Sequence, residues 1–222
     1  MKEQPILNLL LKMSLPMVVS MLVNSLYNIV DSFFVAKISE NAMTALSLVF
    51  PVQNLINAVM IGFGIGINAV ISFYLGAADQ KKADQAASQG MLLGTFHGIL
   101  LMIICLVVIH PFLSLFTNDV DVMAESMSII RFLVPFWFCY ICVNVYPCTL
   151  RGVGDALIPM LIICVGTCIL RVLWVFGAGA VHPGLYTTLT SYPLSWSITS
   201  LAFLVYYYRF SAMRKLNKLI EE

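Results

Sequence analysis

The chain has 222 residues, of which 60% are hydrophobic and only 10% are charged, whereas soluble domains carry roughly 25% charged residues. With a formal net charge of +1 and no basic stripe, the composition excludes a nucleic-acid-binding protein. The apolar residues are gathered in long runs that short polar segments separate. This pattern is typical of a polytopic helical membrane protein.

Six of these runs are long enough to cross a bilayer, which takes about 20 residues at a helical rise of about 1.5 Å per residue. The connections between the runs are short, so successive helices should be antiparallel neighbours. We therefore expect an all-α fold, a bundle of six transmembrane helices that forms a single domain over residues 1–222. The expected spans cover about 14–36, 48–75, 91–116, 128–150, 158–181 and 187–209.

The basic residues predict the orientation of this bundle. All but three of the 12 lysines and arginines fall on one side of the six-span arrangement, and the exceptions are Lys37, Arg131 and Arg171. The positive-inside rule then places both termini in the cytoplasm of a multi-pass plasma (inner) membrane protein. The first apolar run is too long for a signal peptide and contains an aspartate, so we expect it to be retained as a span.

A polar stripe runs along the first span. Ser20, Asn24, Tyr27, Asn28 and Asp31 recur at intervals of three and four residues, which places them on one face of a helix. A carboxylate at that depth costs roughly 2.5–3.5 kcal/mol unless it finds protein, water or a proton. We predict that this face lies against a cavity or a neighbouring helix, away from lipid.

The second span also has a polar face, because Gln53, Asn57, Gly64 and Asn68 align on one side of a helix. Such amides either line a cavity or form hydrogen bonds between helices, and the spacing fits both interpretations. The last span carries Ser and Thr at one face too, which suits a helix interface or a cavity wall. The candidate cavity-lining residues are Asn24, Asn28, Gln53, Asn57 and Asn68.

Three motifs resemble a dinucleotide-binding, a protease and a metal-binding motif, but each has a better explanation. The GxGxG at 62–66 lies inside a span with no strand before it, so it lets helix backbones approach closely rather than binding a dinucleotide. The GxGD at 152–155 matches intramembrane aspartyl proteases, but Asp155 lies at the cytoplasmic face and Asp31 in the outer half, too far apart to share a proton. The six cysteines lie in apolar stretches without a second ligand pair in register. We expect no enzyme activity and no metal site.

Arg171 is the one cation well inside a span. The helical rise places Arg171 about 21 Å and Asp31 about 25 Å from the cytoplasmic ends of their spans. The two side chains can therefore form an ion pair, and the alternative is an arginine that snorkels to the interface. A pair would keep Asp31 charged and would weaken its use as an ion carrier.

Three segments carry a resemblance to a known family. The chain resembles the multidrug and toxic compound extrusion (MATE) family in LPMVVSMLVNSLYNIVDSFFVAKISENAMTALSLVFPVQNL, in GIGINAVISFYLGAAD and in RGVGDALIPM. The most specific piece is the first-span proline, Pro16, with Asp31 fifteen residues later. Family members have twelve spans in two lobes, and this chain has six. Residues 1 to about 116 resemble the first three spans of the N-terminal lobe, and the rest resembles the last three spans of the C-terminal lobe.

The resemblance implies export of amphipathic, often cationic, small molecules in exchange for inward H⁺ or Na⁺, with no other cofactor. It implies that Asp31 carries the coupling ion in competition with the substrate, and that Pro16 is the bend point of the first helix. Because one lobe lacks its partner, a homodimer would restore it within the lipid bilayer. The alternatives are a truncated relative that does not transport and a lipid or precursor flippase of the same superclass.

Overall fold

The computed structural model describes residues 6–181 and 184–210, and these residues form helices without any strand. The side chain of Tyr27 lies outside the described part. The helices are α1 (Ile6–Ala36), α2 (Glu40–Gly76), α3 (Gln80–Ser114), α4 (Val120–Leu133), the 3₁₀-helix η1 (Val134–Phe136), α5 (Trp137–Gly152), α6 (Leu157–Ile163), the π-helical segment η2 (Cys164–Ile169), α7 (Leu170–Val181) and α8 (Leu185–Phe210).

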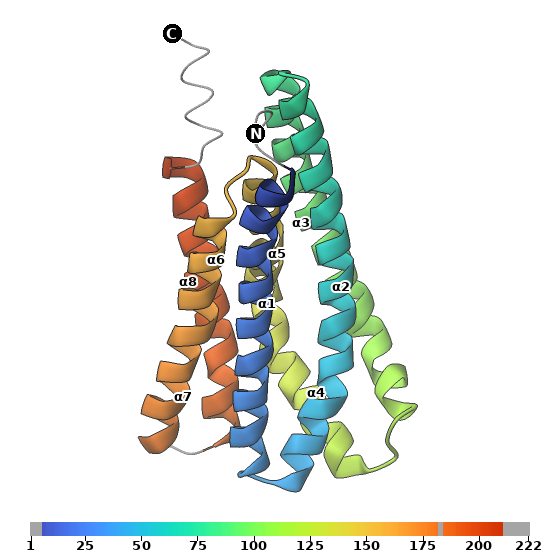
Figure 1. Cartoon of the computed structure of the whole chain (residues 1–222). Coiled ribbons are helices and arrows are strands. Elements are labelled where there is room, and N and C mark those ends of the chain that lie inside the picture. Colours follow the sequence, from blue (N-terminus) through green and yellow to red (C-terminus); the bar gives the residue numbers. More distant parts are fainter. Residues whose placement is uncertain (1–5, 182–183, 211–222) are drawn as a thin grey trace.

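These helices make six antiparallel passes, which confirms the predicted all-α bundle. α4, η1 and α5 together form the fourth pass, and α6, η2 and α7 form the fifth. Figure 1 shows that the α2–α3 and α5–α6 connections lie at the end where α1 begins and α8 ends. Among the described residues, 5 passes are long and apolar enough to cross a membrane. The sixth, α8, has 26 residues and a serine- and threonine-rich first half.

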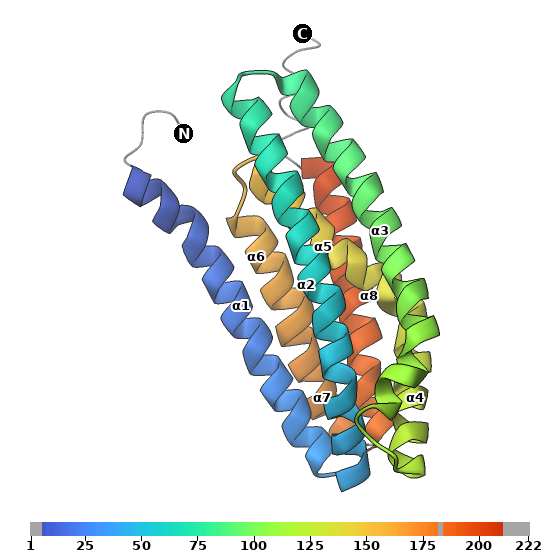
Figure 2. The ribbon, with the colours of Figure 1, turned by 90° about the vertical axis from the view of Figure 1, so that its right-hand side faces the viewer.

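α2 has one apolar face that is buried against several other helices. Val49, Ile56 and Met60 lie on one face and are buried against α3, α4 and α5, whereas Leu55 and Phe73 on other faces are exposed. Exposed large apolar side chains on the outside of a bundle are what a lipid environment requires. The helix lies between α1 and α3 in Figure 2. α2 therefore packs against α1, α3, α4 and α5, and its polar residues can face the interior.

Two passes are interrupted. The fourth changes to a 3₁₀ turn around Pro135. The fifth becomes π-helical over Cys164–Ile169, immediately before the turn that carries Arg171, and the hydrophobic pattern does not predict this change. α1, by contrast, continues as an α-helix through Pro16, so the bend expected there stays a prediction.

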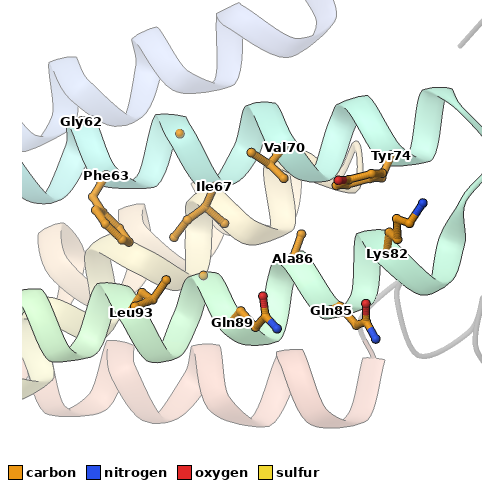
Figure 3. Close-up of a pocket in the computed structure, with 12 residues that line it drawn as sticks. Gly62, Phe63, Ile67, Val70, Tyr74, Lys82, Gln85, Ala86, Gln89 and Leu93 are labelled. Atoms are coloured by element: carbon orange, nitrogen blue, oxygen red, sulfur yellow. The ribbon is translucent and has the colours of Figure 1, made fainter.

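Only one glycine of the GxGxG motif packs as expected. A Cβ on Gly64 would lie 2.5 Å from Cys148 Sγ, so that residue does allow α2 and α5 to approach closely. Gly62 and Gly66 have no atom within 4 Å of such a Cβ, and the packing interpretation is wrong for them. Both glycines line a groove of about 590 Å³ between α2 and α3 on the outside of the bundle (Figure 3).

Asp79 caps the start of α3. Its Oδ1 accepts a hydrogen bond from Lys82 N at 3.1 Å, and its Oδ2 lies 2.9 Å from Lys82 Nζ. These bonds to Lys82 lower the pKa of the Asp79 carboxyl below its usual value. The cap therefore stabilises the charged form of Asp79 in the folded chain.

We expect Asp79→Ala to lower the melting temperature of the purified chain in detergent at pH 7. A carboxyl with a depressed pKa contributes stability above its unfolded pKa of 3.8, and this contribution is lost as the pH falls through the folded pKa. The difference from the wild type should therefore shrink in thermal melts recorded from pH 7 to pH 3. Asp79→Asn keeps an acceptor for the cap and serves as the control, with a smaller loss at pH 7 and no titration of its own. A difference that grows on acidification would contradict this account.

Candidate functional site

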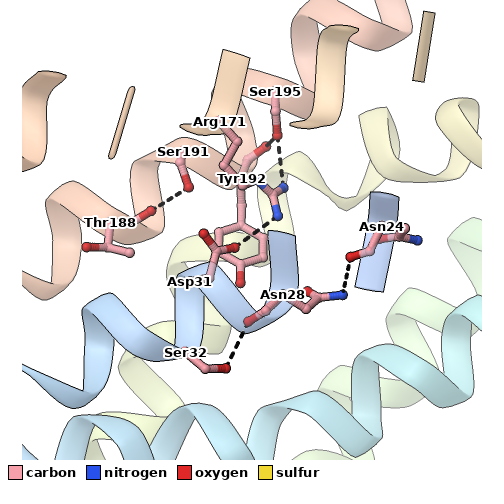
Figure 4. Close-up of polar contacts among 9 residues, drawn as sticks. All are labelled: Asn24, Asn28, Asp31, Ser32, Arg171, Thr188, Ser191, Tyr192 and Ser195. Carbon is pink, nitrogen blue, oxygen red and sulfur yellow. Dashed lines mark hydrogen bonds and ion pairs between the residues drawn. The ribbon is translucent and has the colours of Figure 1, made fainter. Parts of the chain in front are cut away.

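A buried ion pair joins α1 to α7. Arg171 Nη1 lies 3.2 Å from Asp31 Oδ2, and both side chains are only 1% exposed. Arg171 Nη2 donates a hydrogen bond to Ser195 Oγ at 2.9 Å, and the guanidinium lies 3.9 Å from the centroid of the Tyr192 ring. Figure 4 shows these four side chains converging from α1, α7 and α8. The sequence was consistent with either an Asp31–Arg171 ion pair or an arginine that snorkels to the interface. The structure contains the ion pair.

The polar face of α8 forms part of this interface. Thr188, Ser191, Ser195 and Thr199 are all buried. Ser191 Oγ and Ser195 Oγ donate to backbone carbonyls one turn back in the same helix, at 2.6 and 2.9 Å. Small hydroxyl residues satisfied in this way let neighbouring helices approach closely. The face predicted for an interface or a cavity wall therefore packs inside the bundle and brings Ser195 to Arg171.

Two adjoining cavities lie within the bundle beside the ion pair. The larger, of about 300 Å³, is walled by α1, α2, α5 and α8. The smaller, of about 140 Å³, extends along α1, α2 and α5. Asn24 and Asn57 belong to the walls of both. The structure brings all five amides singled out in the sequence to these walls: Asn24, Asn28, Gln53 and Asn57 in the larger, and Asn24, Asn57 and Asn68 in the smaller.

These amides do not bridge helices within the described chain. Asn28 Nδ2 donates to the Asn24 carbonyl in its own helix at 3.0 Å, and Asn68 Oδ1 accepts from Ser72 one turn away at 3.2 Å. Asn24 Oδ1 is buried without a hydrogen-bond partner among residues 6–181 and 184–210. The alternative of interhelical hydrogen bonds is therefore wrong for these side chains. Amide groups left unsatisfied beside a cavity have capacity to bind a ligand or water.

Asp31 lies apart from both cavities. It does not belong to either wall, whereas Tyr192, which stacks on the guanidinium, does line the larger cavity. Of the two surroundings predicted for this face, a cavity or a neighbouring helix, Asp31 has the second, because the guanidinium of Arg171 in α7 lies beside its carboxylate. Any influence of the pair on the cavities passes through Tyr192.

Sequence reasoning missed the aromatic wall and one cation. Tyr140 and Trp196 line the larger cavity with ring centroids 4.8 Å apart, and Tyr192 packs edge-to-face on Trp196 at 5.6 Å. The spacing of four between Tyr192 and Trp196 was the available signal, since it places both rings on one helix face. Arg151 falls just beyond the fourth expected span, which ends at 150, but α5 extends to Gly152 and Arg151 lines the smaller cavity.

Within the described part of the chain, no group of three His, Cys, Asp or Glu side chains is placed to hold a metal ion. Residues 16–176 match the MatE family. The chain belongs to the MatE family. The resemblance seen in the sequence is therefore confirmed, and the chain is a multi-pass membrane protein of the MATE family. The family match runs across position 116, and an origin of the two halves in different lobes stays a prediction.

Relatives of the MATE chain are transporters of about twice its length. It is 26% identical over 182 residues to a FAD transporter of Shewanella oneidensis, which covers 79% of this chain and 39% of the relative. It is 25% identical over 168 residues to the multidrug export protein MepA of Staphylococcus aureus, with 72% of this chain and 36% of the relative covered.

In the solved structures, too, this chain covers less than half of the matched protein. An outward-facing multidrug resistance MATE transporter superposes with a TM-score of 0.80 at 26% identity, over 91% of this chain and 45% of that chain. A MOP superfamily transporter of Pyrococcus furiosus, described as having a binding pocket of reverse polarity, also gives 0.80 at 26% identity, over 91% and 44%. The chain thus spans less than half the length of the relatives it matches.

Proposed function

We propose that this MATE chain is half of a secondary active efflux transporter, which exports amphipathic small molecules in exchange for inward H⁺ or Na⁺. The observation that carries the proposal is the pair of cavities in an apolar bundle, whose walls carry amides that have no partner in another helix among residues 6–181 and 184–210. Polar side chains at membrane depth mark substrate or ion pathways when they face a cavity. The names of the relatives, which export drugs or transport FAD, support small organic molecules as the cargo.

A second copy of the chain completes the pathway in this proposal. Transporters of this kind alternate access by rocking one repeat against another around a site between them. The chain covers 45% of a solved MATE transporter, which is the share expected of one repeat. In a homodimer the cavities of the two copies would face each other across a two-fold axis. Crosslinking in native membranes reports directly on this dimer.

The Asp31–Arg171 pair supplies the coupling step. A proton that reaches Asp31 removes the negative charge that holds Arg171, which weakens the contact of α1 with α7. Arg171 still donates to Ser195 and stacks on Tyr192, which lines the larger cavity. A proton suits this site better than Na⁺, because a proton needs no set of oxygen ligands beside the guanidinium. In this proposal the substrate, through Tyr192, and the proton, through Asp31, both change the position of Arg171.

Dye accumulation in cells tests the proposal. Cells that make the chain should accumulate less of at least one of three dyes, ethidium, rhodamine 123 or fluorescein, than cells with an empty vector. Asn57→Leu, which places an apolar group in the walls of both cavities, should abolish the difference. Asn118→Leu, an exposed change at the other end of the bundle, is the matched control. Protein levels in the membrane must be equal for all variants.

The competing function is a membrane protein that folds but does not transport. It is favoured by the nearly complete burial of the Asp31–Arg171 pair. Unchanged accumulation of all three dyes beside a well-inserted, crosslinkable chain would select this alternative and reject export.

A further inference from the structure

The two cavities have an unusual balance of charge for a binding site expected to take cations. Among the described residues no carboxylate lines either of them, and the ionised side chain that these residues place in the walls is Arg151, at the end of α5. Arg151 forms no ion pair with a carboxylate of the described residues, and its Nε is buried without a hydrogen-bond partner there. The charges of Asp31 and Arg171 cancel each other behind Tyr192. The net charge presented to a ligand is therefore positive.

The acid nearest to Arg151 in the sequence is occupied elsewhere. Asp155 accepts a hydrogen bond from the Tyr206 hydroxyl and lies 3.5 Å from Ile158 N at the start of α6. Its carboxylate therefore serves the α5–α6 connection and α8. A partly buried guanidinium without a counter-ion favours an anion as ligand, since its fork of donors matches a carboxylate or phosphate.

One face of α5 links this cation to the aromatic wall. Tyr140, Asn144 and Arg151 lie at spacings of four and seven, so they share a helix face. Tyr140 lines the larger cavity, and Asn144 and Arg151 line the smaller. At the helical rise, Tyr140 and Arg151 are about 16 Å apart along the helix. An elongated molecule can therefore reach the rings and the guanidinium at once, with amides between them.

We propose that these cavities bind an anionic aromatic molecule rather than a cation. Its carboxylate or phosphate contacts Arg151, its ring system stacks against Tyr140, Tyr192 and Trp196, and the amides of Asn24 and Asn57 hold its polar edge. Aromatic stacking and charge-assisted hydrogen bonds supply the affinity. The inference names the substrate class of the proposed transporter and rests on that function for transport, while binding is tested separately.

The test compares two dyes with the same tricyclic ring system and opposite charge, fluorescein and rhodamine 123. We expect fluorescence anisotropy with the purified chain in a non-ionic detergent to show at least tenfold tighter binding of fluorescein. Arg151→Glu should weaken fluorescein binding at least tenfold and strengthen rhodamine 123 binding, because it reverses the charge of the cavity. Arg151→Lys should retain most of the affinity, and Lys81→Glu, an exposed charge reversal at the same end of the bundle, should change neither dye.

The outcomes separate this inference from the function on which it rests. Equal or tighter binding of rhodamine 123 by the wild-type chain overturns the anionic site without any mutant. Displacement of fluorescein by anionic lipid vesicles, but not by a soluble aromatic carboxylate, would assign Arg151 to a lipid headgroup and overturn it as well. Selective fluorescein binding without export of any dye from cells would support the site and reject export. Trp196→Leu should weaken both dyes equally, since it removes a ring and no charge.

Discussion

Replacing Arg171 with methionine is expected to lower the free energy of unfolding by about 3–5 kcal/mol, because it leaves a buried carboxylate without its counter-ion. The Asp31 side chain is only 1% exposed, so water cannot take the place of the guanidinium without rearrangement. Methionine has similar length and leaves no polar group of its own beside Tyr192. Unfolding of the purified chain in mixed micelles, followed by circular dichroism, measures the loss.

The double variant Asp31→Leu with Arg171→Met decides whether the loss comes from the pair. Replacing both partners of a buried ion pair by apolar residues is often close to neutral. We therefore expect the double variant to be more stable than Arg171→Met alone, with a coupling energy well above that of distant sites. Arg131→Met, at an exposed arginine, should change stability by no more than about 0.5 kcal/mol. Additive losses in the double variant would contradict the pairing.

A substitution of Gly166 by alanine is expected to cost about 1–3 kcal/mol, the usual penalty for overpacking a close contact. An added Cβ would lie 2.2 Å from Thr199 Oγ1 and 3.1 Å from Thr199 Cβ, and Thr199 is fully buried in α8. Rotation of the threonine cannot relieve both contacts, because its Cβ stays in place. The π-helical segment and α8 must therefore move apart, close to Arg171. The same unfolding measurement reports this cost.

Gly62→Ala is the matched control for Gly166→Ala. Gly62 is also helical, but an added Cβ there meets no atom within 4 Å. Alanine favours a helix over glycine by roughly 1 kcal/mol, so this variant should be as stable as the wild type or slightly more stable. Thr199→Ala in the Gly166→Ala background should recover part of the loss, since it removes the nearest atom. Equal costs at Gly62 and Gly166 would show that the contact with α8 is not the cause.

The periodicity of the first two spans was enough to place the amides correctly. Asn24 and Asn28 share a face of α1 with Asp31, and Gln53 and Asn57 share a face of α2, because the helical repeat alone dictates which side chains coincide. What periodicity does not contain is which helices are neighbours. The choice between the Asp31–Arg171 pair and a snorkelling arginine therefore stayed open until the packing of α1, α7 and α8 was known.

Other features left no trace in the hydrophobic pattern. The π-helical segment over Cys164–Ile169 lies in a uniformly apolar run, where an extra residue per turn changes no polar spacing. The apolar run of the fourth span ends at about 150, before Arg151, yet α5 continues to Gly152 and Arg151 lines the cavity. Gly62 and Gly66 look like packing residues in the sequence, and only the position of α3 and α5 shows that they have open space.

The hydroxyl-rich face of α8 has a consequence for how the protein is made. Ser191 and Ser195 on this face donate to carbonyls of their own helix and are buried against other passes, so the helix is accommodated inside the bundle. On its own it is less apolar than the other five passes, and the insertion machinery would release it into lipid less readily. α5 and α7 precede α8 in synthesis and contact it directly. Membrane integration of α8 is therefore expected to depend on α5 and α7 remaining next to the translocon until α8 is made.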